Sequence, residues 1–101
     1  MAYRYILDLQ QEATIQAKEV VSRLLHREGG VRTRIFAFDA GQELAAHSAA
    51  HPAILQVLSG QGRLTLGEAK PGTWVHMPAG LVHAIRAESP LTLLLISLPK
   101  E

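Results

Sequence analysis

GTWVHMPAGLVH, the stretch at positions 72–83, contains the pattern that decides the fold. Its landmarks are Gly72, Pro78, Gly80 and His83, in the order G-x5-P-x-G-x2-H. Pro78 has a fixed φ angle and no backbone N–H, so it suits the end of a strand. Gly80 can adopt the positive φ angle that tight turns often require. The stretch therefore predicts a strand ending near Pro78, a turn, and a new strand that carries His83.

Short apolar runs separated by Gly, Pro and Asp extend this pattern in both directions. VVSRLLHRE (20–28) and VRTRIFAFD (31–39) flank a Gly-Gly pair, which is a hairpin signal, and the second run alternates with a period of two. Further apolar runs follow at 53–60, 62–68, 73–78, 81–87 and 91–98. A series of about eight short strands with Gly/Pro turns predicts an all-β sandwich or barrel. Helix is expected only weakly, over residues 8–20.

Length and composition bound the class of protein. A chain of 101 residues, 48% hydrophobic and 19% charged, fits one globular domain over 1–101. Residues 31–98 are expected to form the barrel core, and 1–25 to form N-terminal strands that pair two copies into a homodimer, because a small barrel has exposed edges. The absence of cysteine excludes disulfides and thiolate chemistry, so any metal must be held by His, Asp or Glu.

Charge and hydropathy patterning exclude two further classes of partner. The formal net charge of +1 comes without a basic run, which argues against a nucleic-acid-binding surface. No apolar run approaches the roughly 20 residues that a membrane-spanning helix needs, and the first residues do not resemble a signal peptide. We therefore expect a cytoplasmic protein that contacts neither nucleic acid nor membrane.

A second motif lies upstream: Gly41 precedes His47 by five intervening residues, and Gly60 follows that histidine thirteen positions later. Together with the 72–83 pattern, this spacing resembles the two motifs of the cupin superfamily, particularly its small single-domain members. The resemblance implies a single antiparallel cupin jelly-roll barrel with little or no helix, usually homodimeric. It also implies a metal site in which His47 matches the first histidine and His83 matches the last.

This sequence departs from the cupin pattern at the other ligand positions. The second histidine and the glutamate of the first motif fall at Ala49 and Ala53. His51 is a candidate third ligand, because alternate residues of an extended strand share one face. It would lie about 13 Å beyond His47 along a straight strand, so joint ligation requires a bend at Pro52. The alternative interpretation is a loop residue beside proline. The imidazoles alone do not distinguish Zn, Fe, Ni, Mn and Cu.

The barrel interior is expected to be a mostly apolar cavity, which is the usual form of a small-molecule site. Its predicted wall consists of Leu55, Val57, Ile85 and Trp74. Alanines at the missing ligand positions are expected to enlarge it and to favour an uncharged or aromatic ligand.

Two functions follow from this sequence, and no catalytic residue is assigned for either. The first is a cupin that binds a divalent metal and a small organic molecule, with oxygenase or isomerase chemistry. The second is a metal-free binding or sensor module whose histidines form hydrogen bonds to the ligand.

Overall fold

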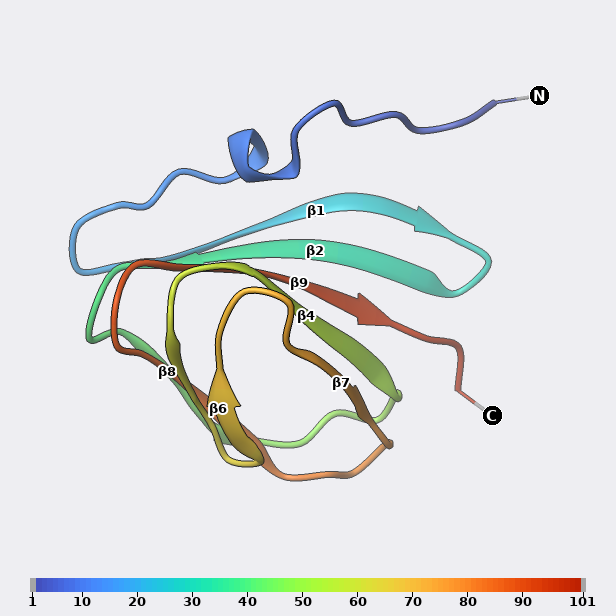
Figure 1. Cartoon of the computed structure of the whole chain (residues 1–101). Coiled ribbons are helices and arrows are strands. Elements are labelled where there is room, and N and C mark those ends of the chain that lie inside the picture. Colours follow the sequence, from blue (N-terminus) through green and yellow to red (C-terminus); the bar gives the residue numbers. More distant parts are fainter. Residues whose placement is uncertain (1, 101) are drawn as a thin grey trace.

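The computed structural model describes residues 2–100, which form nine strands and one short 3-10 helix (Figure 1). Every pair of neighbouring strands is antiparallel. The strands form a five-stranded sheet in the order β1-β2-β9-β4-β7 and a four-stranded sheet in the order β3-β8-β5-β6. The elements are η1 Leu9–Glu12, β1 Val20–Glu28, β2 Val31–Phe38, β3 Glu43–His47, β4 Ala53–Ser59, β5 Gly62–Leu64, β6 Gly67–Ala69, β7 Trp74–Met77, β8 His83–Ala87 and β9 Leu91–Ser97. The prediction of an all-β antiparallel fold with little helix is confirmed.

The β1–β2 hairpin forms where the Gly-Gly pair predicts it. Glu28 and Val31 are the last paired residues, so the loop between them has two residues. Gly29 and Gly30 both have positive φ angles, 58° and 82°. Two-residue hairpin loops of this kind match the twist of the flanking strands and require residues that tolerate positive φ.

The core lies between the two sheets and follows from the alternation of side chains. On β2, Phe36 and Phe38 share one face, and on β9 Leu91 and Leu93 lie opposite them in register. Phe38 and Leu91 are fully buried in a cluster that also contains Leu55, Val57, Met77, Ile85 and Leu93. Both sheets thus bury one face against the other, as a two-layer β domain must.

The N-terminal segment differs from the prediction of strands within residues 1–25. Within residues 2–19 the one regular element is the four-residue η1, and strand structure begins at Val20, so the prediction holds for residues 20–25 alone. Ile6, Leu9 and Ala13 pack against a small cluster on the outward face of the five-stranded sheet, formed by Leu25, Ile35 and Leu94. The outward face is apolar around this cluster, so the segment covers that part as a separate layer and does not extend the sheet. Figure 1 shows the segment passing along β1 and β2. Met1 lies outside the described residues.

Within residues 2–100, no helix has the length and hydropathy to cross a membrane.

Candidate binding site

The two motif histidines face each other because their strands pair in register. His47 ends β3 and His83 begins β8, and the two residues are direct cross-strand partners. The turn of the second motif fixes this register. Gly80, with a φ angle of 83°, donates its backbone N–H to the carbonyl oxygen of Ala49 at 2.8 Å. The two motif loops are therefore joined by the backbone itself, beside the histidines.

The imidazole rings of His47 and His83 have centroids 4.4 Å apart and planes inclined at 55°. Each ring forms the same local hydrogen bond. Nδ1 of His47 lies 2.9 Å from the carbonyl oxygen of Ala45, and Nδ1 of His83 lies 3.0 Å from that of Leu81. A carbonyl oxygen only accepts, so both Nδ1 atoms donate. In the neutral rings, each Nε2 then keeps its lone pair for a hydrogen-bond donor or a metal ion.

His51 lines the same cavity, but it does so from a loop and not from the strand face that the alternation of side chains predicts. Residues 48–52 form a loop between β3 and β4, so His51 does not follow His47 along an extended strand. The loop folds back, and His51 Nδ1 donates to the carbonyl oxygen of Leu98 at 3.0 Å. Its ring is partly buried and lies at the edge of the cavity lining.

The cavity itself is small, at about 50 Å³. It is lined by His47, Ala49, His51, Ala53, Met77, Pro78, Leu81, His83, Leu95 and Ser97. That volume suffices for a few waters or for one end of a small molecule, whereas sites for whole drug-sized ligands span roughly 300–1,000 Å³. The expectation of an enlarged interior is therefore wrong. Ala49 and Ala53 do line the cavity, but Met77, Leu81 and Leu95 also line it and leave little space.

The residues do not fit the full cupin metal site. Among residues 2–100, no group of three or more His, Cys, Asp or Glu side chains is arranged to hold a metal ion. The structure thus brings His47 and His83 together and does not add His51 as a third ligand. Glu43 does not replace the missing carboxylate, because it is exposed and forms an ion pair with Arg86 at 3.5 Å.

The predicted wall residues divide into two groups. Leu55, Val57 and Ile85 are buried in the core cluster and do not line the cavity. Trp74 is 58% exposed, so its prediction as a wall residue is wrong. It pairs with the exposed Gln56 of β4, on the outward face of the sheet.

Five lining residues were not predicted as such: Met77, Pro78, Leu81, Leu95 and Ser97. The last two occupy alternate positions of the apolar run 91–98, and this period of two was the available signal for them.

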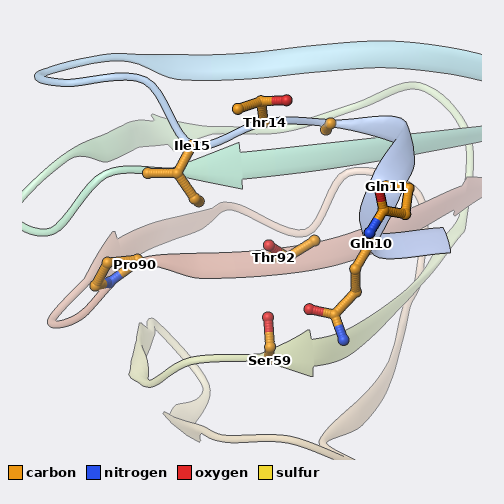
Figure 2. A pocket seen from close by; sticks show the side chains of 8 residues that line it. Gln10, Gln11, Thr14, Ile15, Ser59, Pro90 and Thr92 are labelled. Atoms are coloured by element: carbon orange, nitrogen blue, oxygen red, sulfur yellow. The ribbon is translucent and has the colours of Figure 1, made fainter. Parts of the chain in front are cut away.

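A second, larger cleft of about 300 Å³ lies on the outward face of the same sheet, under the N-terminal segment. Figure 2 shows Gln10 and Thr14 of that segment beside Ser59 of β4 and Thr92 of β9. The side chains lining it are uncharged amides, hydroxyls and apolar groups. It contains no histidine or ionisable group, so this cleft lacks the chemistry of the inward cavity.

Two facing antiparallel sheets with one histidine from each motif strand define a cupin. The chain belongs to the ChrR cupin-like domain family, whose model matches residues 7–99. Among curated proteins, no sequence matches it at a significant level.

Solved structures agree with this membership. A conserved protein of unknown function from Streptococcus pyogenes, SPY1581, is 30% identical, with a TM-score of 0.85 and coverage of 100% of this chain and 92% of that one. A cupin superfamily protein from Desulfitobacterium hafniense is 20% identical, with a TM-score of 0.86 and coverage of 98% and 94%. A chain of the complex between Rhodobacter sphaeroides SigE and the anti-sigma ChrR is 21% identical, with a TM-score of 0.72 and coverage of 77% and 44%. The last two likenesses concern the fold alone.

Proposed function

We propose that the chain is a binding domain for a small organic molecule that presents a hydroxyl or amine hydrogen to His47 and His83. One observation carries this proposal: the two rings face each other at 4.4 Å, and both Nδ1 atoms are bonded to backbone carbonyls. Both Nε2 lone pairs are thereby available to the same ligand. His83 is buried and most of the lining is apolar, which strengthens a hydrogen bond made at that ring, whereas His47 is exposed.

A divalent transition metal at the same two histidines is the second candidate function. The orientation of the rings favours it, because metal-bound histidines commonly donate their other ring N–H to a carbonyl or carboxylate. A bound metal would supply a Lewis acid. Against this candidate, His47 and His83 offer only two donors, whereas protein zinc sites usually use three or more side chains. Oxygenase and isomerase activities stay predictions, as does a cytoplasmic location.

Removal of either imidazole should weaken binding of 6-hydroxyhexanamide, a neutral probe with a terminal hydroxyl, by about tenfold. That factor corresponds to one hydrogen bond in a partly buried site. His47→Phe and His83→Phe keep a ring of similar shape and lose the nitrogens. The measurement is a ligand titration followed by NMR, with folding checked by circular dichroism.

His76→Phe is the matched control, because His76 is exposed on the outward face of β7. Equal affinities for all three variants and the parent chain would refute ligand contact by the motif histidines. Elemental analysis of untagged protein after incubation with Zn, Ni, Mn, Cu and Fe(II) separates the two candidates. Close to one equivalent of metal, lost in both motif variants, would favour the second candidate.

We further propose that two copies associate through the N-terminal segment. Tyr3, Tyr5 and Leu7 are 88%, 71% and 85% exposed, so alternate positions of an extended stretch present apolar side chains to solvent. The adjacent β1 is an edge strand of the five-stranded sheet. A second copy would cover both features, since exposed edges and exposed apolar patches are commonly sites of association.

The triple change Tyr3→Ser, Tyr5→Ser and Leu7→Ser should convert a dimer to a monomer at micromolar concentration, as measured by light scattering. Leu66→Ser with Val82→Ser is the control, because those side chains are also exposed but lie elsewhere. A parent chain that is already a monodisperse monomer would contradict the proposal.

A further inference from the structure

The strand register places two arginines in the same row of side chains as the cavity. Directly paired residues on neighbouring strands project from the same face of a sheet. Across the inward face of the five-stranded sheet, the pairings give the row Arg27, Arg32, Ser97, Ala53 and Met77. The last three residues of this row line the histidine cavity. Arg32 on β2 is therefore paired directly with Ser97 on β9, and Ser97 lines the cavity.

The next row repeats the arrangement one step deeper. Arg34 of β2 is the partner of Leu95, which also lines the cavity. Arg32 and Arg34 share their face with Phe36 and Phe38, so this face of β2 runs from the buried core to a cationic end at the mouth.

Arg27 and Arg32 lie directly opposite each other, and no negative group occupies their row. Like charges in this position are destabilising. Within residues 2–100, neither arginine forms an ion pair. Glu28 is close in sequence, but it is directed toward His26, whose Nε2 lies 3.5 Å from its carboxylate. An anion between the two arginines would convert this repulsion into attraction.

The second sheet contains a matched arginine pair in which the charges are compensated. Arg63 and Arg86 are also direct cross-strand partners. Their row, however, reads Glu43, Arg86, Arg63 and Glu68, so a carboxylate flanks each arginine. Both sheets therefore contain a cross-strand arginine pair. The Arg27–Arg32 pair differs in that no carboxylate flanks it in its row.

His51 connects the arginines to the histidine cavity. A cleft of about 350 Å³ at the β1–β2 turn is lined by Arg27, Glu28, Gly29, Gly30, Arg32 and His51. The same His51 lines the small inward cavity. The outer cleft has room for the larger part of a ligand, and the inner cavity has room for one end of it.

We infer that the ligand is a short organic acid whose carboxylate binds Arg27 and Arg32 and whose far end reaches His47 and His83 past His51. This inference rests on the proposed function and names its ligand class. Arginine presents a planar fork of donors that matches a carboxylate. Arg32 lies one strand spacing, about 5 Å, from Ser97 in the cavity lining, and His47 and His83 lie across the cavity on the facing sheet, about 10 Å away from backbone to backbone. Side chains reach into this gap from both sheets, so a chain of about six carbons is a suitable probe. An organic acid differs from the uncharged or aromatic ligand expected from the barrel interior alone, because the two arginines lie outside that interior.

The test compares 6-hydroxyhexanoate with 6-hydroxyhexanamide, which has the same shape and no charge. The parent chain should bind the acid at least tenfold more tightly than the amide at low salt, as measured by calorimetry or NMR titration. Arg32→Gln and Arg27→Gln should each remove most of that difference while binding of the amide is unchanged. Arg63→Gln is the matched control and should keep the full difference.

Thermal denaturation supplies a readout that a purely structural arginine would not give. Because the pair is repulsive, Arg32→Gln should leave the melting temperature equal or higher, while 6-hydroxyhexanoate should raise the melting temperature of the parent chain more than that of the variant. A lower melting temperature with an unchanged acid-to-amide ratio would assign Arg32 to structure and overturn the inference.

Other outcomes separate this inference from the proposed function. Equal binding of acid and amide, both lost in His83→Phe, would overturn the acid assignment and leave the proposed function standing. Acid binding that needs Arg32 but is unaffected by His83→Phe would overturn the proposed function and, of this inference, would leave only the contact between the carboxylate and the arginines. Inorganic phosphate that binds equally well, with no gain from the carbon chain, would overturn the connection between cleft and cavity. Binding of neither probe at millimolar concentration would overturn the inference outright.

Discussion

Gly60→Ala is expected to destabilise the domain by at least about 3 kcal/mol, a large part of the stability of a small domain. Gly60 has a φ angle of 87°, a conformation that alanine rarely adopts. A Cβ atom at this position would overlap the carbonyl oxygen of Pro90 and lie 2.8 Å from the Cα of Leu91. Both obstacles are backbone atoms at the start of β9, so relief would require displacement of a central strand. Urea denaturation measures the loss.

Gly41→Ala provides the control for the backbone angle alone. Gly41 has a similar φ angle of 82°, and among the described residues other than Gly41 and its two chain neighbours no atom lies within 4 Å of an added Cβ. Gly41→Ala should lower the free energy of unfolding only by the strain of a left-handed residue, about 1–2 kcal/mol. If both glycines gave the same loss, the close approach of the chain at Pro90 would not be the cause.

Phe38→Ala should lower the free energy of unfolding by about 3–5 kcal/mol, the usual cost of removing a fully buried aromatic ring. Phe38 has no exposed surface and lies in the cluster between the two sheets. Removal of its ring leaves a cavity that β4 and β9 cannot close without losing their own packing. Chemical denaturation with circular dichroism and tryptophan fluorescence measures the change.

Phe36→Ala is the matched comparison, since its ring stacks on that of Phe38 at a centroid distance of 6.2 Å but is only partly buried. We expect a clearly smaller loss for this variant. Equal denaturation midpoints for Phe36→Ala and Phe38→Ala would contradict the placement of the core.

Much of the fold could be predicted because local signals agree with the tertiary structure. The first two predicted strands have nearly the observed bounds, since a Gly-Gly turn and a period of two specify a hairpin without distant information. The convergence of His47 and His83 was predictable only from motif spacing, because it depends on pairing between strands far apart in sequence.

The rest depended on packing that no local pattern encodes. Residues before Val20 form a covering layer because of apolar residues on the outward face, which come from three different strands. His51 reaches the cavity through a loop, and the small cavity volume reflects side chains contributed by β7 and β9. Trp74 was predicted inward although its alternation with Met77 places it outward.

The backbone hydrogen bonds that orient the two rings determine which sequence changes relatives can tolerate at this site. His47 and His83 are each oriented by the carbonyl oxygen two residues earlier, an atom that every amino acid supplies. Substitutions at positions 45 and 81 can therefore accumulate without rotating either imidazole. A single-residue insertion between an anchor and its histidine would lengthen this two-residue link and separate Nδ1 from the carbonyl oxygen that orients it. Relatives that keep these imidazoles should thus tolerate changes of side chain here and show no change of length.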